Sequence, residues 1–386
     1  MRASGSHAKI GPIKERGDMR FSTNGHGPLM IDLFCGAGGM TLGFVRAGFR
    51  PAFAVDTDPA AVATYQANFG CHVVQGPIES VTHYPPADVI IGGPPCQGFS
   101  QLGKRLPHDP RNQLWRYFME SVNLLRPAAF VIENVPQLLT SQEYAEICRE
   151  ARELGYQIDG KVLNAADFGV PQTRKRAIVV GCRAGSPHFP AQTHWNPEKG
   201  VPFNRKPWRT VKDAIGDLPL IPDGRDLHIG RNPTAKSLLR YAAIPEGGNR
   251  WHMPRELQPG CWIRKTRGGT DLMGRLWWNR PAFTIRTEFF KPEKGRYLHP
   301  EAQRPITHRE AARLQTFPDD FEFLGSKIEI ARQIGNAVPP DLAFAVASAV
   351  RSLLDSDYRV EGSAVYLRET RAPPLPPIAS VAQTSS

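Results

Sequence analysis

The sequence lacks the features that mark membrane-spanning and secreted proteins. It has no run of 18 apolar residues, and its first 27 residues are polar, without the apolar core of a signal peptide. Six cysteines in 386 residues, with no Cys-x-x-Cys pair, make neither a disulfide framework nor a structural zinc site. We therefore expect a cytoplasmic protein with reduced thiols, no membrane segment and no metal.

Acidic residues are scarce in one third of the chain. Residues 183–304 contain 22 Lys and Arg but only 11 Asp and Glu, whereas the other 264 residues carry 26 of each sign. The same third holds six of the seven tryptophans. The overall composition, 41% hydrophobic and 22% charged, is that of a globular protein. A neutral body with a basic insert predicts that the two parts have different functions. The insert could bind a polyanion by neutralising its phosphates.

Short apolar runs alternate with helical patterns over the first 180 residues. The runs that we interpret as strands lie at 29–34, 51–55, 87–91, 128–132 and 177–181. This alternation predicts a parallel, doubly wound, Rossmann-like α/β sheet, whose ligands bind at the carboxyl ends of strands.

The strand–helix rhythm stops after residue 181. Helical periodicity returns at 307–316, where Thr307 and Glu310 form a capping box, and again at 341–354. We expect four parts, with boundaries as follows: flexible tails at 1–27 and 359–386, a catalytic domain at 28–182 plus 320–358, and a smaller irregular domain with its hinge at 183–319.

A glycine-rich turn follows the first predicted strand. In Phe34-Cys-Gly-Ala-Gly-Gly39, the glycines at 36, 38 and 39 allow a ligand to approach the backbone closely. The next strand ends in Asp56, where an acid can accept hydrogen bonds from ribose hydroxyls. The turn lacks both the GxGxxG spacing suited to pyrophosphate and the P-loop lysine, so an adenosine cofactor without phosphates fits best. The alternative role for Asp56 is the N-cap of the following helix.

One cysteine lies in an unusual setting. In Gly92-Gly-Pro-Pro-Cys-Gln-Gly-Phe-Ser100, two glycines and two prolines place Cys96 on a rigid turn at the end of an apolar strand. This setting favours a nucleophilic thiol over a small buried core residue.

Six motifs together resemble those of the DNA (cytosine-5)-methyltransferases of bacterial restriction–modification systems. The resemblance runs from about Leu29 to Leu354 and keeps the order of the family's motifs. The motifs are Phe34-Cys-Gly-Ala-Gly-Gly39, Pro94-Pro-Cys-Gln-Gly-Phe-Ser100, Glu133-Asn-Val135, Gln172-Thr-Arg-Lys-Arg176, Arg309-Glu-Ala-Ala-Arg-Leu-Gln-Thr-Phe-Pro318 and Gly335-Asn-Ala-Val-Pro-Pro340.

The resemblance implies methyl transfer from S-adenosylmethionine to C5 of a cytosine flipped out of duplex DNA. By this resemblance Cys96 adds to C6 of the base, Glu133 supplies or shares a proton at N3, and Arg174 contacts the flipped base. Arg176 is then a phosphate-contacting or structural companion. The product would be S-adenosylhomocysteine, and no metal is implied.

The resemblance also implies a set of cofactor contacts, with Phe34 stacking on the adenine and Asn336 and Val338 near the methionine end. The full set is Phe34, Gly36, Gly38, Gly39, Asp56, Ile78, Pro94, Asn336 and Val338. The chain departs from the family pattern at two positions. Pro77 stands where an acid often contacts the adenine amine, and Asp56 stands where Glu is commoner.

The basic insert corresponds to the family's target-recognition region. Its candidate DNA contacts, together with two from the loop after Cys96, are Gln97, Ser100, Arg264, Lys265, Arg267, Arg286 and Arg296. The expected partners are duplex DNA and a cognate restriction endonuclease, and we expect a monomer at the nucleoid. Three rival functions are a tRNA cytosine-5 methyltransferase, a silent DNA-binding paralogue and a small-molecule methyltransferase. The long insert disfavours the first and third, and the presence of Cys96 and Glu133 disfavours the second.

Overall fold

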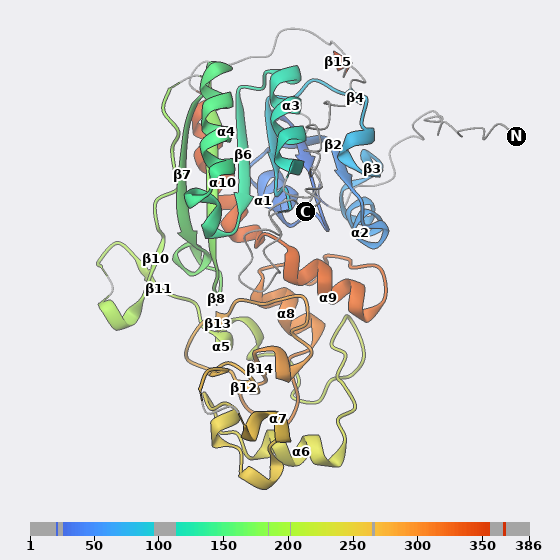
Figure 1. Cartoon of the computed structure of the whole chain (residues 1–386), viewed down its shortest axis with the longest axis vertical. Helices are drawn as coiled ribbons and strands as arrows, with labels where there is room; N and C mark the ends of the chain where they lie inside the picture. The colour runs from blue at the N-terminus through green and yellow to red at the C-terminus, as the bar shows by residue number, and fades with distance from the viewer. Residues whose placement is uncertain are drawn as a thin grey trace, which may run out of the picture.

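The computed structural model describes residues 21, 26–95, 113–183, 185–200, 202–264, 267–355 and 366–367. An α/β body, drawn in blue and green with a red helix, lies above a lower part with little regular structure (Figure 1). The predicted boundaries of the four parts stay a prediction.

The body is built on a seven-stranded sheet of order β3-β2-β1-β5-β6-β9-β7. The strands are β1 (Leu29–Leu33), β2 (Arg50–Asp56), β3 (Val73–Gln75), β5 (Val89–Gly92), β6 (Ala129–Asn134), β7 (Gln157–Asn164) and β9 (Lys175–Cys182). The five strands from β3 to β6 pair in parallel, as the sequence predicts.

The expectation of parallel strands is wrong for β9, which runs antiparallel to both β6 and β7. The chain passes from β7 to β9 through a 3-10 turn (Ala165–Phe168) and the short strand β8 (Gln172–Thr173). Without a crossover helix the returning strand must run in the opposite direction. The sequence pattern does not predict strand β7. It is an edge strand whose side chains are mostly half-buried or exposed, so it contains no apolar run.

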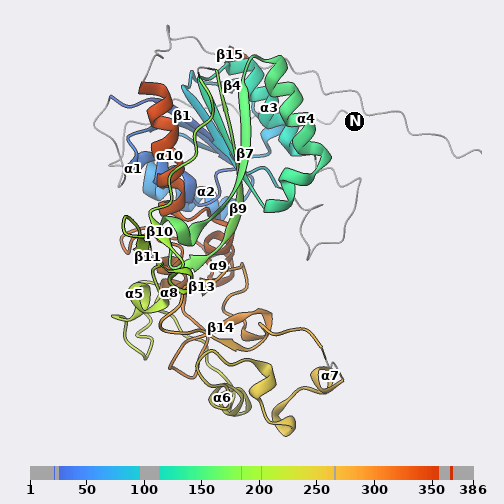
Figure 2. The ribbon, with the colours of Figure 1, turned by 90° about the vertical axis from the view of Figure 1, so that its left-hand side faces the viewer.

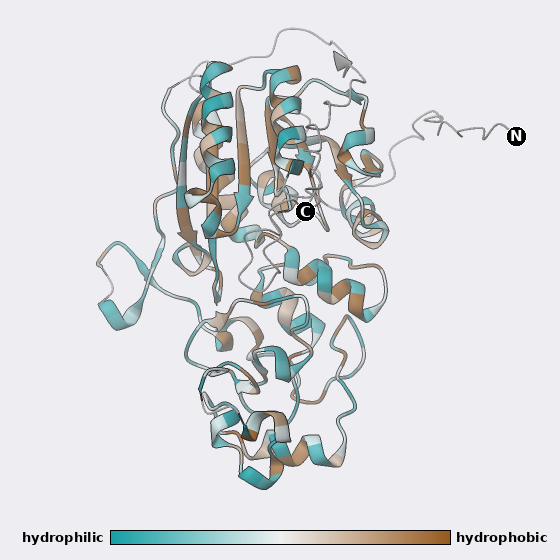
Figure 3. Ribbon diagram, viewed as in Figure 1, coloured by the Kyte–Doolittle hydropathy of each residue, from teal (hydrophilic) through white to brown (hydrophobic). Residues whose placement is uncertain are grey.

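Helices cover both faces of the sheet (Figure 2). One face carries α1 (Gly39–Arg46), α2 (Pro59–Phe69) and α10 (Pro340–Asp355), and the other carries α3 (Leu114–Leu125) and α4 (Gln142–Glu153). Helices α1 and α10 pack so closely that a Cβ on Gly43 would lie 2.4 Å from the Cβ of Ala343. The hydropathy colours show apolar strands between amphipathic helices (Figure 3).

The lower part has short elements, and much of its apolar core is continuous with that of the body. Its elements, with those that connect it to the body, are β10 (His194–Trp195), β11 (Lys206–Pro207), α5 (Val211–Ile215), α6 (Ala235–Ala242), α7 (Gly260–Ile263), β12 (Gly274–Arg275), β13 (Ala282–Phe283), β14 (Arg296–Leu298), α8 (His308–Leu314) and α9 (Lys327–Asn336). Figure 3 shows hydrophilic and hydrophobic colours mixed over it, and one small apolar cluster around Tyr241, Met253 and Leu298 is separate from the main core.

Three buried arginines supply much of the internal bonding of the lower part. Arg275 donates to the main-chain carbonyls of residues 241, 244, 299 and 302, and Arg296 donates to those of residues 247, 248 and 275. Arg250 donates to the Gly268 carbonyl at 2.7 Å and stacks on Trp251. Hydrogen bonds from these side chains to the backbone therefore stabilise this part in addition to its apolar contacts.

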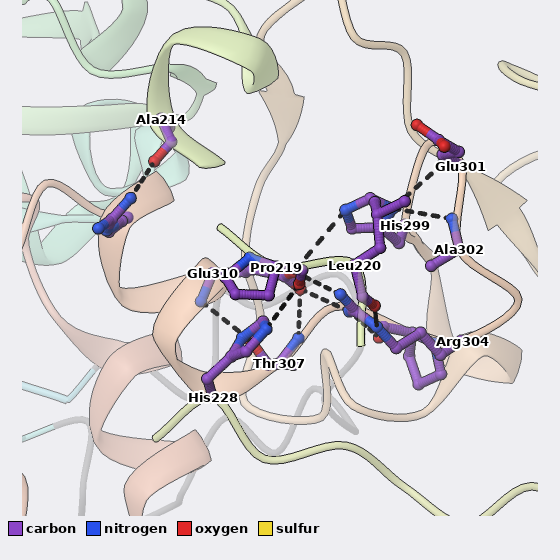
Figure 4. Close-up of polar contacts among 12 residues, drawn as sticks. Ala214, Pro219, Leu220, His228, His299, Glu301, Ala302, Arg304, Thr307 and Glu310 are labelled. Atoms are coloured by element: carbon purple, nitrogen blue, oxygen red, sulfur yellow. Dashed lines mark hydrogen bonds and ion pairs between the residues drawn. The ribbon is translucent and has the colours of Figure 1, made fainter. Parts of the chain in front are cut away.

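A buried polar network joins the lower part to α8 (Figure 4). Glu310, fully buried, accepts two hydrogen bonds of 2.8 Å from Arg304. The predicted capping box is confirmed, because Thr307 and Glu310 exchange both of its hydrogen bonds. His228 completes the network through the Thr307 hydroxyl.

Most of the two expected tails lies outside the described residues, but described residues of each tail contact the body. Phe21 packs against Phe69 and Phe321, and β15 (Tyr366–Leu367) pairs with β4 (His83–Tyr84). Within the described chain, the stretch Lys327–Leu354 is long and apolar enough to cross a membrane by length and composition. Half of its most apolar window is buried and α10 packs on α1, so we interpret it as part of the core.

Candidate active site

A cavity of about 750 Å³ opens where several strands of the sheet end. Its walls come from the turns after β1, β2 and β5, from the last residues of β6, from the start of β9 and from the end of α9. Strand β9 runs antiparallel to the other strands, so its first residues lie at the same edge of the sheet as the last residues of β1, β2, β5 and β6. Both the size of the cavity and its place in the fold are typical of small-molecule sites in α/β proteins.

Ten of the residues predicted from the sequence line this cavity. They are Phe34, Gly36, Gly39, Asp56, Pro94, Glu133, Arg174, Arg176, Asn336 and Val338. Gly38 and Ile78 do not line it. At Gly38, with φ +86°, a Cβ would lie 2.4 Å from the Phe69 ring, so this glycine permits close packing behind the turn. Ile78 is buried in the apolar core.

Three predicted residues of the nucleophile loop and one of the recognition region lie outside the described residues: Cys96, Gln97, Ser100 and Lys265. The described chain reaches Pro95 on one side of that loop, and Pro95 lines the cavity.

Asp56 fixes the glycine turn rather than starting a helix. One carboxylate oxygen accepts a hydrogen bond from the Gly36 amide at 2.8 Å, and the other accepts one from the Asp58 amide at 2.9 Å. The alternative role as N-cap of α2 is wrong, because Asp58 caps that helix through the Ala60 amide. Burial raises the pKa of Asp56 above its ordinary value.

Asp32 lines the cavity as well, although the sequence pattern does not predict it as a site residue. It lies inside β1, 1% exposed, and accepts a hydrogen bond of 2.5 Å from the Thr41 hydroxyl. Desolvation, with a smaller contribution from the charge of Asp56, raises its pKa to about 7. The available signal was an acid within the apolar run 29–34.

The ends of β5 and β6 hold a glutamate beside the proline turn. Glu133 pairs with the Arg176 guanidinium at 3.0 Å, and a Cβ on Gly93 would lie 3.2 Å from the other Glu133 carboxylate oxygen. The Asn134 side chain donates to the Pro94 carbonyl at 2.9 Å. The chain that leads to Cys96 is thus tied to the strand that carries Glu133.

Arg174 is buried in the wall of the cavity, 2% exposed. Its two terminal nitrogens donate to the carbonyls of Ile285 and Gly335, both at 3.1 Å. Its buried Nε has no hydrogen-bond partner among the described residues. Burial, and to a smaller extent the neighbouring charge of Arg176, lower the pKa of Arg174.

The candidate DNA contacts fall into two groups. Arg264, Arg267 and Arg286 are exposed. Arg296 is 5% exposed and its guanidinium is bonded to main-chain carbonyls, so the interpretation of Arg296 as a DNA contact is wrong. The sequence alone did not distinguish a solvent-facing arginine from one that supports the backbone.

Comparisons with known proteins agree on one family. Residues 29–352 match the model of the C-5 cytosine-specific DNA methylase family. The chain is 39% identical over 340 residues to the Type II methyltransferase M1.HphI of Haemophilus parahaemolyticus, covering 83% of this chain and 86% of the relative. It is 35% identical over 343 residues to the Type II methyltransferase M.NgoFVII of Neisseria gonorrhoeae, covering 86% and 88%.

A solved structure shares the fold. It is described as that of a prophage-encoded DNA modification methyltransferase of E. coli, with a TM-score of 0.65 and 30% identity over 86% of this chain and the whole of the other.

Proposed function

This chain belongs to the C-5 cytosine-specific DNA methylase family, and on that premise we propose how its residues carry out the reaction. The chain is a DNA (cytosine-5)-methyltransferase of the Type II, restriction–modification kind. The proposed route is a covalent adduct between Cys96 and C6 of a cytosine flipped out of duplex DNA. One observation carries the proposal: Glu133, Arg174 and Arg176 share a single cavity with Phe34 and Asp56.

The donor set of the cavity suits S-adenosylmethionine, which supplies an electrophilic methyl group on a sulfonium when bound. Phe34 offers a half-buried ring for the adenine, and the Asp56 carboxylate offers acceptors for ribose hydroxyls. Gly39 brings the first turn of α1 against the Val338 carbonyl, where a Cβ would lie 2.5 Å away. Asn336 and Val338 would hold the methionine end.

The chemistry of the base needs a nucleophile and a proton. The Cys96 thiolate forms a bond to C6, and the charge that develops at N3 is taken up by a proton held by Glu133. C5, now nucleophilic, would take the methyl group and leave S-adenosylhomocysteine. Water would accept the C5 proton, the Cys96 thiolate would leave C6, and the N3 proton would return to Glu133, which restores the aromatic ring.

The two arginines hold the base end of the cavity. The Nε of Arg174 would donate to an acceptor on the flipped cytosine, which gives that buried donor the partner it lacks. Arg176 positions Glu133 through their ion pair and thereby keeps its carboxyl group toward N3.

The lower part would bind and read the duplex, with Arg264, Arg267 and Arg286 as exposed contacts and other cations on phosphates. Two further expectations concern partners and location. A restriction endonuclease of the same specificity would be the functional partner, and a monomer would act on DNA at the nucleoid in the cytoplasm.

The decisive experiment is bisulfite sequencing of DNA from cells that express the wild-type chain or Cys96→Ser, with the exposed Cys71→Ser as the matched control. We expect one methylated sequence context in the wild type and in Cys71→Ser, and none in Cys96→Ser. Methylation that persists in Cys96→Ser would contradict the covalent route. Methylation of tRNA in place of duplex DNA would contradict the assigned substrate.

A further inference from the structure

An ion pair joins two walls of the cavity that come from opposite ends of the chain. Asp58, at the start of α2, and Arg332, on α9, approach to 2.7 Å between Oδ2 and Nη2, and both line the cavity. Building on the proposed function, we propose that this pair is a latch of the cofactor site. It opens when S-adenosylmethionine enters or S-adenosylhomocysteine leaves, and it closes behind the bound molecule.

The position of the pair supports this role. On one side Asp58 follows Asp56, the proposed ribose contact, in the turn between β2 and α2. On the other side Arg332 lies one turn before Asn336, the proposed contact of the methionine end. A closed pair therefore connects the turn that faces the ribose to the helix that ends at the methionine moiety.

The rest of the contact between α2 and the chain before α9 is more firmly bonded. Asn68 exchanges hydrogen bonds of 2.8 and 3.0 Å with the backbone of Glu322, and the Leu324 amide donates to the Thr64 hydroxyl at 2.8 Å. The far end of α2 is thus attached to the backbone before α9, whereas at the near end Asp58 meets Arg332 side chain to side chain. The side-chain pair can therefore open while the backbone contact between these segments stays in place.

The two partners contribute differently. One oxygen of Asp58 caps α2 by accepting from the Ala60 amide, so this carboxylate is held in place whether or not the pair is formed. The Arg332 side chain is 46% exposed and that of Asp58 is 23% exposed. Ion pairs exposed to this extent add little to stability, so the pair can open at small cost, with Arg332 as the moving partner.

A second ion pair offers a closely matched control. Arg116 and Glu146 join α3 to α4 at the same distance, 2.7 Å, with side chains 45% and 24% exposed. Neither residue lines the cavity. If loss of an exposed ion pair changes the dissociation rate only through a general effect on the fold, the change should be equal for the two pairs.

The test measures the dissociation rate of S-adenosylhomocysteine from the full chain by stopped-flow displacement. The variants are Asp58→Asn, which keeps an N-cap, Arg332→Gln and their combination, with Arg116→Gln and Glu146→Gln as controls. We expect dissociation about two- to fivefold faster in each latch variant, the range that corresponds to an exposed ion pair. The double variant should be no faster than either single one, because both remove the same contact.

Salt and a conservative variant add two readouts that a merely structural role would not move. About 0.5 M NaCl should bring the wild-type rate close to that of Arg332→Gln and leave that variant nearly unchanged. Arg332→Lys should retain part of the slow rate. Equal rates in the wild type and the latch variants, or equal acceleration in the controls, would overturn the latch. Failure of the wild type to bind S-adenosylhomocysteine would instead overturn the proposed cofactor site.

Discussion

The body and the lower part use their buried and partly buried charged groups in different ways. In the body, carboxylates such as Asp32, Asp56 and Glu133 lie around a cavity and face a space for ligands. In the lower part, Arg250, Arg275 and Arg296 are 2–5% exposed and point into the protein, where they bond to main-chain carbonyls. Charged groups line a cavity in the first part and hold main-chain carbonyls in the second.

Part of the positive charge in residues 183–304 lies inside the protein. Arg250, Arg275 and Arg296 are buried among carbonyls, and Arg304 is paired with buried Glu310. These four cations count toward the excess but are unavailable to phosphate. The proposed DNA-binding surface is therefore less positive than the sequence count indicates, and we expect its affinity for DNA to depend on fewer arginines and lysines.

The largest expected effect lies in the body. Glu133→Gln keeps the shape of the side chain but cannot deliver a proton to N3, so we expect the single-turnover methylation rate to fall about 10²- to 10⁴-fold. The exposed Glu153→Gln should leave the rate unchanged. An active Glu133→Gln enzyme would remove the functional reason for burying this carboxylate.

The next effect lies at the junction between the parts. Glu310→Gln leaves the Arg304 guanidinium buried without its charge partner, which should lower the free energy of unfolding by about 3–5 kcal/mol. Urea unfolding followed by circular dichroism measures the change. A loss below about 1 kcal/mol would show that the network tolerates an unpaired charge, as exposed pairs do.

Stability should depend on pH through Asp32. Its pKa is about 7 in the folded chain against an ordinary value of 3.8, so the folded state binds the extra proton between these values. The contribution of Asp32 to stability is full below about pH 4 and is lost as pH rises through 7, a change on the order of 4 kcal/mol. Asp32→Asn should flatten this dependence in unfolding curves measured from pH 4 to 8. Parallel profiles for the two proteins would place the proton elsewhere.

The lower part should lose stability when its internal arginines are removed. Arg296→Met leaves several buried carbonyls without their donor, and we expect a loss of about 2–3 kcal/mol. Thermal unfolding in the absence of DNA is the measurement. If this variant instead keeps its stability and loses affinity for DNA, the division between supporting and binding arginines fails.

The smallest change in stability is expected at an exposed arginine of the same region. Arg267→Met should alter the free energy of unfolding by less than about 0.5 kcal/mol. It should also reduce the slope of log affinity for DNA against log salt by about 1, the loss of one phosphate contact. Fluorescence anisotropy from 50 to 200 mM salt would measure it, with Arg296→Met as the partner in the comparison.

Sequence patterns predicted the features that depend on residues close together in the chain, such as strands, motif turns and helix caps. The apolar runs located most strands of the sheet, and the motifs led to ten residues that line one cavity. Thr307 and Glu310 followed from a spacing of three residues, because a capping box is a local structure.

The missed features depend on contacts between distant segments. The pairing of Asp58 with Arg332 has no local signal, because neither residue has an unusual neighbour in sequence. Arg296 looked like other basic residues, since the carbonyls that hold it come from residues 247, 248 and 275. Strand β9 runs in the reverse direction because no crossover helix precedes it. The apolar run that predicted this strand does not indicate its direction.

The close packing of α1 against α10 bears on how the chain matures during synthesis. Gly43 of α1 lies against Ala343 of α10. The helix that covers α1 on this face of the body therefore comes from the C-terminal part of the chain. A growing chain would leave the ribosome with the α1 surface uncovered until residues 340–355 have been made. Residues 183–304, the proposed recognition region, emerge in that interval. The body would therefore be completed only after this region has been made, and an arrested chain would expose an apolar face that chaperones and proteases recognise.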